Sequence, residues 1–328
     1  MRRSALIFGV TGQDGSYLAE LLLEKDYQVY GLVRRSSNDN LQRIAHLLDR
    51  LELIPGDLSD QTSIARALTA VQPQEIYNLA AQSFVGSSYT EPLHTADITG
   101  LGALRLFEAV RTCLPKTLGA RLYHASSSEM FGNAAPPQSE ATVFAPVSPY
   151  ACAKVFAHYC AQLYRSAYSL HISCGINFNH ESERRGEEFV TRKVTKALGR
   201  IQAGQQTELR LGNLSARRDW CHASDVMQAA WLMVQQERPD DYVIASGESH
   251  SVQEFVELAF NYASLDMQQY LKLDPSLYRP LDVSHLQGCA AKAKAKLGWS
   301  PTVSFAELVQ RMVEHDRYGV TPSVPRCC

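Results

Sequence analysis

The chain has 328 residues, 45% of them hydrophobic, so it is long enough to bury one large core, or one core and a smaller lobe. Its 32 lysines and arginines nearly balance its 34 aspartates and glutamates, so an anionic ligand must be held by local basic residues. No apolar run approaches the ~18 residues that cross a membrane, no secretory signal follows the N-terminal arginines, and the eight cysteines show no CxxC spacing. We therefore expect a cytoplasmic protein with no metal, nucleic acid or membrane as partner, and we assign no role to the terminal cysteines, Cys327 and Cys328.

The first half of the chain alternates short apolar runs with helical periodicity. Strands are predicted at 4–8, 28–33, 53–55, 76–80, 121–125 and 171–178. Helices are predicted between them at 14–25, 41–51, 64–71, 100–111 and 149–169. This alternation predicts an α/β fold with a doubly wound parallel sheet of the Rossmann type, which we assign to residues 1–178.

After residue 178 the pattern loosens. Polar, arginine-rich segments lie at 180–185 and 213–220. The helices predicted around them are 190–203, 225–236, 252–264, 290–297 and 304–315. We expect residues 179–328 to form a smaller lobe that mainly binds the substrate and makes excursions back to the sheet.

Three glycines, Gly9, Gly12 and Gly15, lie between the first predicted strand and the first helix. A glycine turn there lets backbone N–H groups approach a pyrophosphate, while the helix N-terminus supplies partial positive charge. The spacing is GxxGxxG rather than the GxGxxG of the usual fingerprint, and glycines in such turns can serve packing alone. Their position at the start of a βαβ unit favours dinucleotide binding.

The residues after the second strand indicate which dinucleotide is bound. An acidic residue there usually reads a ribose 2′-hydroxyl, whereas a 2′-phosphate calls for arginine. This chain has Arg34 and Arg35 at that place, followed by the hydroxyl donor Ser36. The pattern favours NADP, although both arginines could instead be solvated on a surface turn. Asp57, after the third strand, suits an adenine contact, a helix cap or a turn.

Tyr150 and Lys154 lie four residues apart on the longest predicted helix and therefore share one face. We expect the lysine to lower the pKa of the phenol and to bind nicotinamide ribose hydroxyls, so that the phenolate takes a proton from a sugar hydroxyl. The pair is a weak signal by itself, because a chain with 15 tyrosines has roughly even odds of a chance match. Its weight comes from its position after the strand at 121–125.

That strand leads into the segment ASSSEMFG at 125–132, at the sheet edge where doubly wound folds bind ligands. Ser127 is the candidate to share a proton with Tyr150. Glu129 distinguishes between reactions, because a ketone at C4 of a sugar makes the C5 proton acidic and a 4,6-dehydratase needs a base to remove it. A 4-reductase or 4-epimerase needs none. Taken alone, Glu129 could equally be a cap or a surface charge.

Six segments resemble the GDP-mannose 4,6-dehydratase family of the extended short-chain dehydrogenase/reductase superfamily, and they extend over nearly the whole chain. They are GVTGQDGSYLAELLLEK (9–25), YNLAAQSFVGSSY (77–89), SSSEMFG (126–132), SPYACAK (148–154), NHESERRGEEFVTRK (179–193) and LGNLSARRDW (211–220). The last two are far more specific than the glycine turn. The resemblance implies conversion of GDP-mannose to GDP-4-keto-6-deoxymannose by internal hydride transfer through bound NADP.

The resemblance also implies a role for each matching residue. Tyr150, helped by Ser127 and Lys154, deprotonates the C4 hydroxyl, and Glu129 removes the C5 proton and assists loss of the C6 hydroxyl. The residues implied to bind NADP are Gly9, Thr11, Gly12, Gln13, Asp14, Gly15, Arg34, Arg35, Ser36, Asp57, Leu58, Leu79, Ala80, Ala81, Ser83, Tyr150, Lys154, His180 and Arg185. Those implied to bind the GDP-sugar are Ser83, Glu129, Asn179, Lys193, Arg218 and Arg279. The 34–38 loop resembles a segment through which family members associate, with Arg35 reaching a neighbour, so a homodimer or homotetramer is implied.

Several positions depart from the family pattern. Ser127 stands where threonine is usual, and Glu183 replaces a proline. The other departures are Ser215, Cys221, Ser284 and Cys289. None deletes a chemical group of the implied mechanism, but enzymes acting on GDP-manno-heptose share most of the motifs, so the sugar stays open.

Two other interpretations also stay open. A GDP-sugar C4 oxidase, reductase or epimerase would use the same scaffold, but it has no requirement for a base such as Glu129. A catalytically inactive, NADP-binding regulatory protein would be expected to lack Tyr150, Lys154 or Glu129, and this chain has all three.

Overall fold

The computed structural model describes residues 2–35, 40–278 and 280–318, and its centre is a seven-stranded sheet. Neighbouring strands are all parallel, in the order β11-β6-β5-β4-β1-β2-β3. The strands are β1 Ser4–Phe8, β2 Gln28–Val33, β3 Leu51–Pro55, β4 Glu75–Asn78, β5 Arg121–Ser127, β6 His171–Asn177 and β11 Asp241–Ile244. The chain builds outward from β1 on both sides, which confirms the predicted doubly wound sheet.

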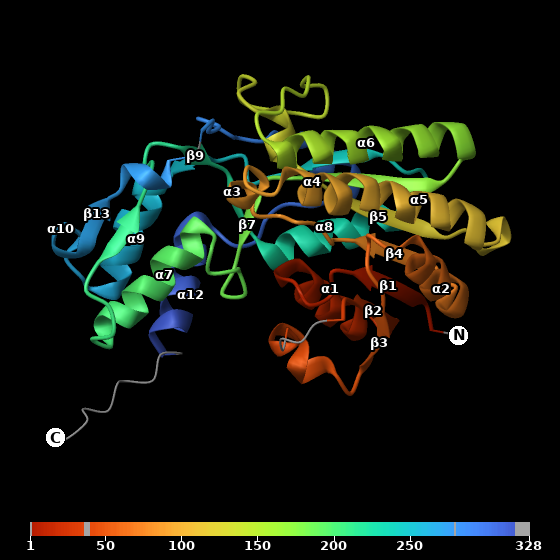
Figure 1. Cartoon of the computed structure of the whole chain (residues 1–328), viewed down its shortest axis with the longest axis horizontal. Coiled ribbons are helices and arrows are strands. Elements are labelled where there is room, and N and C mark those ends of the chain that lie inside the picture. Colours follow the sequence, from red (N-terminus) through yellow and green to blue (C-terminus); the bar gives the residue numbers. More distant parts are fainter. Residues whose placement is uncertain (1, 36–39, 279, 319–328) are drawn as a thin grey trace.

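Helices cover both faces of the sheet (Figure 1), because its strands are apolar on both sides. Ala5 and Ile7 of β1 face one core, whereas Leu6 and Phe8 face the other. The helices of the first core are α1 Gln13–Glu24, α8 Ala223–Gln235 and α11 Ala291–Leu297. Those of the second core are α2 Gln61–Val71, α5 Gly102–Cys113 and α6 Pro149–Tyr168.

A smaller lobe lies beside the sheet, at the left of Figure 1. Three helices bury a separate core around Trp220 and Phe255, namely α7 Val190–Gln202, α9 Val252–Ala263 and α12 Phe305–Tyr318. Short strands pair as β7 Asn179–Glu181 with β10 Trp220–His222, β9 Arg217–Arg218 with β12 His250–Ser251, and β8 Leu209–Leu211 with β13 Leu271–Leu273. Buried Arg192 and Asp316 form an ion pair at 2.7 Å that joins α7 to α12.

Some observed elements differ from the predicted ones. The helix predicted at 41–51 is only a 3₁₀-helix at Gln42–Leu47, because the buried Ile44 and Leu47 match its three-residue turn. The helix predicted at 100–111 is preceded by a π-helical turn and two short helices, namely Ala96–Leu101, α3 Val85–Ser88 and α4 Pro92–Thr95. Strand β11 and the short helix α10 Met267–Tyr270 were not predicted, because four-residue elements are too short to show a period.

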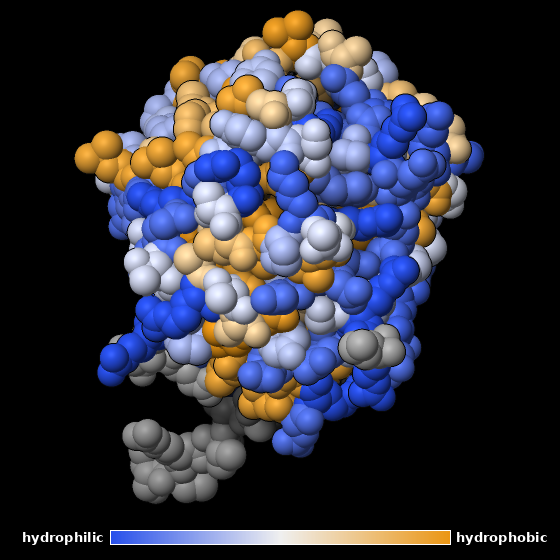
Figure 2. All heavy atoms as spheres, turned by 90° about the vertical axis from the view of Figure 1, so that its right-hand side faces the viewer, coloured by the Kyte–Doolittle hydropathy of each residue, from blue (hydrophilic) through white to orange (hydrophobic). Residues whose placement is uncertain are grey.

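The end of the molecule opposite the smaller lobe carries mainly hydrophilic side chains, with hydrophobic ones between them (Figure 2). In the described part of the chain, no helix combines enough length with enough apolar character to span a membrane. All six cysteines within the described residues are free thiols. The carboxyl ends of the strands face the other way, toward the lobe (Figure 1).

Candidate active site

A cavity of about 670 Å³ lies where the carboxyl ends of the strands meet the smaller lobe. It is lined by the glycine turn, by residues that end or follow strands β2 to β6, and by parts of the segments at 179–193 and 211–220. Nearly all the predicted site residues line it. The exceptions are Arg35, which is described but lies outside the lining, and Ser36 and Arg279, which lie outside the described residues.

The glycine turn brings the main chain close to the neighbouring strand end. Gly9 has a φ of +86°, and a Cβ there would lie 2.9 Å from the backbone nitrogen of Ala80. At Gly15 a Cβ would lie 2.2 Å from the Gly9 carbonyl oxygen. Gly12 caps α1 without a side-chain hydrogen bond. The first N–H groups of α1 are therefore available to an anion in the cavity.

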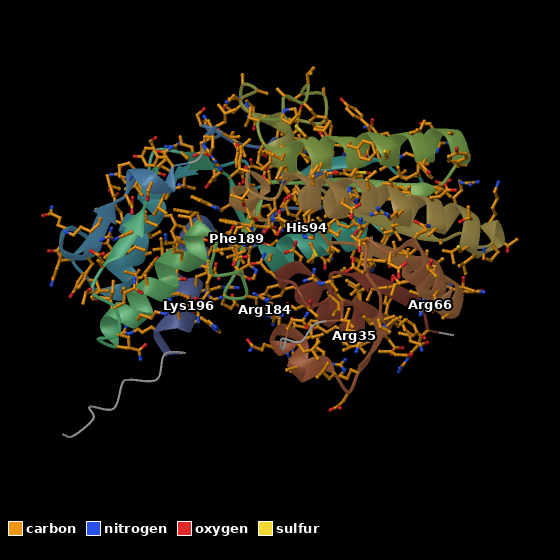
Figure 3. The ribbon with its side chains drawn as sticks, in the orientation of Figure 1. Arg35, Arg66, His94, Arg184, Phe189 and Lys196 are labelled. Atoms are coloured by element: carbon orange, nitrogen blue, oxygen red, sulfur yellow. The ribbon has the colours of Figure 1, made fainter. Side chains whose placement is uncertain are left out.

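The end of β2 places one of the two predicted arginines in the cavity. Arg34 and Arg35 are both exposed, but Arg34 alone of the two lines the cavity. Figure 3 shows Arg35 at the side of the molecule where β2 and β3 lie. The carboxylate of Asp57 lines the cavity and also shapes the turn after β3, because it accepts from the N–H and the hydroxyl of Ser59, both at 2.8 Å.

Ser127 is the last residue of β5, and Glu129 lies two residues further on in the 3₁₀-helix Ser128–Phe131; both lie near the first turns of α6. The Ser127 hydroxyl accepts from the Glu129 N–H at 3.2 Å. Tyr150 and Lys154 lie on α6, whose N-terminus is capped by Ser148. All four predicted catalytic side chains line the cavity, and each residue is at most 9% exposed. The structure thus brings them together in a site that excludes most water.

The pKa of Tyr150 is raised and not lowered as the sequence predicted, and Lys154 is not among the main causes of the shift. Burial raises the pKa of Tyr150 to about 12, although a hydrogen bond with Ser127 opposes the rise, and the charge of Glu129 adds to it. Lys154 donates to the Ala125 carbonyl at 2.6 Å, and its Nζ lies 5.8 Å from the centroid of the Tyr150 ring. Burial lowers the pKa of Lys154 itself to about 8. The ammonium of Lys154 is hydrogen-bonded to β5, and burial is the largest influence on the pKa of the Tyr150 phenol.

His180 contacts the glycine turn directly. Its Nε2 lies 2.8 Å from Oδ2 of Asp14, and its Nδ1 lies 2.8 Å from the Phe178 carbonyl oxygen. Burial disfavours the charged forms of Asp14 and His180, but the attraction between the two side chains outweighs the effect of burial. The pKa of Asp14 falls to about 2, and the pKa of His180 is raised. Gln13 adds a further contact by donating to the His180 carbonyl at 3.1 Å.

Arg185 lines the cavity from the loop before α7. Its guanidinium lies 3.5 Å from the centroid of the Phe189 ring, and its Nε lies 3.2 Å from Glu181. Figure 3 shows Phe189 near the start of α7, with Arg184 between the lobe and the sheet. The ring and the carboxylate fix the position of Arg185, whose cation can then face an anionic ligand.

Arg218 and Lys193 bring positive charge to the lobe side of the cavity. Arg218 donates to the Val283 carbonyl at 2.7 Å and lies 3.2 Å from Asp282. Burial lowers the pKa of Lys193. Asn179 lines the same region from β7. In a chain with a net charge of −2, this concentration of cations fits a diphosphate.

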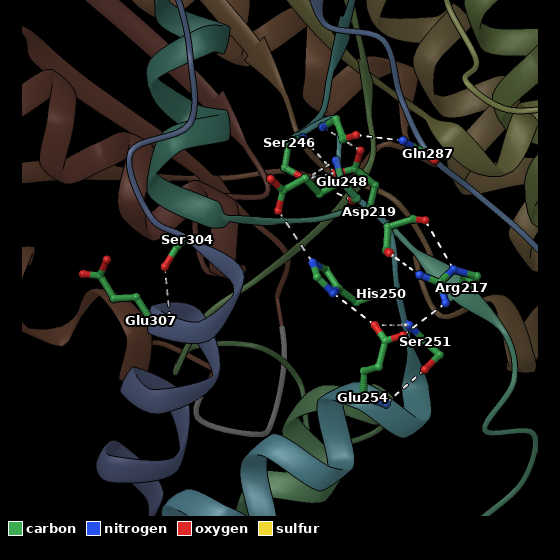
Figure 4. Close-up of polar contacts among 12 residues, drawn as sticks. Arg217, Asp219, Ser246, Glu248, His250, Ser251, Glu254, Gln287, Ser304 and Glu307 are labelled. Atoms are coloured by element: carbon green, nitrogen blue, oxygen red, sulfur yellow. Dashed lines mark hydrogen bonds and ion pairs between the residues drawn. The ribbon is translucent and has the colours of Figure 1, made fainter.

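The register of β9 decides which arginine of the RRDW segment reaches the cavity. Arg217 lies 3.1 Å from Glu254, outside the lining (Figure 4). Successive residues of a strand face opposite sides, so Arg218 faces the cavity. Buried Asp219 holds the strand in place, because it accepts from the N–H and the hydroxyl of Ser246 at 2.7 and 2.6 Å.

Most residues that depart from the family pattern lie outside the cavity lining, namely Glu183, Ser215, Cys221, Ser284 and Cys289. The Ser284 N–H donates to the side chain of Asn133 at 3.1 Å, and Cys221 packs in the sheet core. Ser127 does line the cavity, and it keeps the hydroxyl that the family position requires. The departures therefore leave the lining chemistry unchanged.

The cavity also holds residues that the sequence analysis missed. Phe84 and Phe189 meet edge to face with ring centroids 5.5 Å apart, and both line the cavity. They lie inside the resembling segments, so that signal could have identified them. Asn40 and Tyr278 line the cavity from loops, where no periodic pattern marks a position.

The fold and the cavity define an extended short-chain dehydrogenase/reductase, with a Rossmann-type sheet, a glycine turn and a buried tyrosine–lysine pair. The family model described as GDP-mannose 4,6 dehydratase matches residues 6–312. The chain belongs to the GDP-mannose 4,6-dehydratase family and is an enzyme of the sugar-nucleotide 4,6-dehydratase type.

Individual relatives agree with this assignment, and a solved structure shares the fold. GDP-mannose 4,6 dehydratase 1 of Arabidopsis thaliana is 52% identical over 96% of this chain and 90% of its own length. The human GDP-mannose 4,6 dehydratase is 46% identical over 96% of this chain and 91% of its own length. A dTDP-glucose 4,6-dehydratase from Bacillus anthracis, solved in complex with NAD, has the same fold, with a TM-score of 0.83 and 20% identity over 97% of each chain.

Proposed function

We propose that this chain converts GDP-mannose to GDP-4-keto-6-deoxymannose, a carbon–oxygen lyase reaction, and that it uses bound NADP. The observation that carries the proposal is the position of Glu129 in one cavity with Ser127, Tyr150 and Lys154. Oxidation at C4 needs the tyrosine and its neighbours alone, whereas elimination of water across C5 and C6 also needs a base for the C5 proton. The names of relatives at 46% and 52% identity support GDP-mannose as the substrate.

The buried side chains account for the proton movements. Tyr150 takes the proton of the C4 hydroxyl onto its phenol oxygen. Ser127, which is hydrogen-bonded to that phenol, shares the proton. Glu129 takes the C5 proton, made acidic by the C4 ketone, and gives it to the departing C6 hydroxyl, which leaves as water. While Glu129 carries this proton, it lacks the negative charge that raises the pKa of Tyr150. Proton transfer to Glu129 therefore favours the phenolate form of Tyr150.

The residues around the glycine turn fit NADP. When bound, NADP supplies the acceptor for the C4 hydride and the donor of a hydride to C6, so the reaction needs no external oxidant. The N–H groups after Gly12 would hold the pyrophosphate, and the cation of Arg34 would hold the 2′-phosphate. Lys154 would bind the nicotinamide ribose. Arg34 follows β2 and lines the cavity, and this supports NADP over NAD.

We assign cofactor binding to residues 1–178 and substrate binding mainly to residues 179–328. The division rests on the positions of the lining groups. The glycine turn and Arg34 lie on the sheet side, whereas Lys193 and Arg218 lie on the lobe side. Two cations on the lobe side would hold the GDP diphosphate, while the sugar would reach Glu129 at the end of β5.

We infer that the enzyme is a homodimer or homotetramer. Arg35 is exposed and lies outside the cavity lining, as a residue that reaches a neighbouring subunit would. The outer face of α6 leaves Phe156, Tyr159 and Leu163 42%, 53% and 58% exposed, and helix association would bury them. Sedimentation velocity at micromolar concentration tests the inference, and a monomer would contradict it.

The test of the proposed reaction is incubation with GDP-mannose in D₂O, followed by NMR of the product. We expect a 4-keto-6-deoxy sugar that carries deuterium at C5 and no net accumulation of NADPH. The original C5 proton leaves with the water, and after a hydride has been added at C6 the enolate takes a new proton at C5, which Glu129 can supply once it has been protonated again from D₂O. A parallel incubation with GDP-manno-heptose tests the sugar. Unchanged GDP-mannose together with consumed GDP-manno-heptose would overturn the substrate and leave the reaction type intact.

A further inference from the structure

Glu183 lies outside the cavity but contacts two of the elements that form it. Its Oε1 accepts a hydrogen bond from the Tyr17 hydroxyl at 2.8 Å, and its Oε2 lies 3.6 Å from Nε2 of His222. Tyr17 belongs to α1, the helix that begins at the glycine turn. His222 ends β10 and caps α8. The Glu183 side chain is 28% exposed, so most of it is shielded from water.

The ring of His222 presents a donor to this carboxylate. The Ser224 N–H donates to Nδ1 of His222 at 3.2 Å, so we assign the proton of the neutral ring to Nε2. Within the described residues, Nε2 of His222 and Oε2 of Glu183 are both buried and have no hydrogen-bond partner. Their separation of 3.6 Å is longer than a normal hydrogen bond, so an approach of less than 1 Å would pair them.

The charge of Glu183 makes this contact strong enough to matter. Burial alone would raise the pKa of Glu183, but its contacts with His222 and Tyr17 lower it to about 2. The group is therefore a carboxylate at neutral pH. A charged acceptor facing a buried ring N–H forms a stronger hydrogen bond than a neutral pair.

Glu183 joins the two sides of the cavity because of where it lies in the chain. His180 and Arg185, on either side of it, line the cavity next to the glycine turn. His222 ends the segment that carries Arg218, one of the cations on the lobe side. A shift of that segment on nucleotide binding would change the separation of His222 and Glu183 and so act on the loop that carries His180.

Two other side-chain contacts of the same loop reach α1. Ser182 donates to Gln13 at 2.8 Å, and Arg184 lies 2.7 Å from Glu20. Both partners belong to α1, so these contacts fix the loop to the cofactor side without reaching β10. Glu20 therefore offers a matched control, since it is a carboxylate that binds the neighbouring residue of the loop.

We propose that Glu183 is a positioning residue that couples the two sides of the cavity, so that a bound nucleoside-diphosphate sugar makes the enzyme hold its dinucleotide cofactor more tightly. The inference rests on the proposed function for the identity of the nucleotide. It is independent of turnover, because it concerns two binding equilibria that are linked through one side chain.

The experiment is a titration of the purified enzyme with NADPH, followed by fluorescence, with and without saturating GDP. In the wild-type enzyme GDP is expected to tighten NADPH binding by ~5-fold or more. The Glu183→Gln variant is expected to lose most of this gain, since its neutral amide is a weaker acceptor for His222. The Glu20→Gln variant is expected to keep the gain. A structural role alone would lower affinity with and without GDP by the same factor.

The outcomes separate this inference from the proposed function. If GDP tightened NADPH binding equally in the wild type and in Glu183→Gln, the coupling role would be overturned. The same holds if GDP bound to the wild type without tightening NADPH binding. Failure of the wild type to bind GDP would overturn the proposed nucleotide and this inference together. If Glu183→Gln does not fold, Tyr17→Phe, which removes one hydroxyl from the same carboxylate, is expected to reduce the gain, and an unchanged gain in it counts against the coupling role.

Discussion

The imidazole of His180 and the carboxylate of Asp14 meet at 2.8 Å, although they are 166 residues apart in the chain. Asp14 lies in the first turn of α1, where the helix N-terminus favours a negative charge. An uncompensated carboxylate there would repel the pyrophosphate that the glycine turn is shaped to bind. Pairing with His180 removes most of this repulsion, and it also fixes the lobe-side loop on the cofactor helix.

The first prediction concerns the pH dependence of this pair. Asp14, with a pKa lowered from 3.8 to about 2, contributes stability that is present above pH 3.8 and is lost as the pH falls through about 2. His180, with a pKa raised above 6.5, contributes stability that is fully present below pH 6.5 and is lost as the pH rises through its folded value. The pair is therefore most stabilising between pH 3.8 and 6.5.

Urea unfolding of wild type and Asp14→Asn at several pH values measures this window. We expect Asp14→Asn to lower the free energy of unfolding by roughly 1–2 kcal/mol near about pH 5, and by clearly less near about pH 9. For His180→Gln we likewise expect a larger loss in the free energy of unfolding at the lower of these two pH values than at the higher one. A loss that is the same at both pH values would show that the pair is not ionised in the folded chain.

The second prediction separates the two half-reactions. Glu129→Gln should still oxidise C4 but stall before elimination, so that kcat falls by ~10²–10⁴ and reduced cofactor accumulates on the enzyme. Tyr150→Phe should block both steps and accumulate none. Stopped-flow absorbance of the nicotinamide distinguishes the two variants. Turnover of Glu129→Gln at the wild-type rate would remove Glu129 from the mechanism.

The same variant also tests the electrostatics of Tyr150. The charge of Glu129 is one of the causes that raise the pKa of Tyr150, so its removal should lower that pKa. The rate of C4 oxidation in Glu129→Gln should therefore reach its plateau at a lower pH than in the wild type. A pH profile unchanged from the wild type would mean that the two side chains do not interact during this step.

The third prediction concerns cofactor choice at the end of β2. Arg34 lines the cavity and Arg35 does not, so Arg34→Ala should weaken NADP binding by ~10–100-fold and leave the affinity for NAD nearly unchanged. Arg35→Ala is the matched control and should change NADP affinity little. Isothermal titration with both dinucleotides measures this. Equal losses for NADP and NAD in Arg34→Ala would contradict a contact with the 2′-phosphate.

Much of the fold follows from residues whose local pattern agrees with their final environment. The strand at Ser4–Phe8 is apolar on both faces, and its bounds were predicted to the residue, whereas the helix after the glycine turn lies one residue earlier than predicted at each end. The α-helix predicted at 41–51 was wrong because the spacing of its apolar residues suits the three-residue turn of a 3₁₀-helix as well as an α-helix. Strand β11 was not predicted because it is defined by its pairing with β6, a tertiary contact that the pattern of four residues does not reveal.

The site shows a similar division. Chain position and chemistry placed Ser127, Glu129, Tyr150 and Lys154 in one cavity, because the strand ends of a doubly wound sheet meet there. The pKa of Tyr150 could not be predicted in the same way. It depends chiefly on how deeply the phenol is buried and on the charges around it, and a four-residue spacing shows neither.

The last prediction concerns the buried ion pair between α7 and α12. Arg192 donates to both carboxylate oxygens of Asp316 at 2.8 and 2.7 Å, and Thr195 donates to the same carboxylate at 2.6 Å. Asp316 is fully buried, and Arg192 also lies 3.4 Å from the Arg185 carbonyl. Asp316→Ala leaves the guanidinium buried without its partner, so we expect a loss of about 3–5 kcal/mol in the free energy of unfolding.

An apolar replacement of both partners tests whether that loss comes from the unpaired charge. The double variant Arg192→Met, Asp316→Leu removes both charges and fills most of their volume, so it should recover much of the stability lost in Asp316→Ala. It still lacks the bond from Arg192 to the loop of Arg185, and we expect its NADPH affinity to stay below that of the wild type. Urea unfolding and NADPH titration of the same preparations measure the two effects. A double variant less stable than Asp316→Ala would show that the pair itself, rather than the absence of a buried charge, stabilises the lobe.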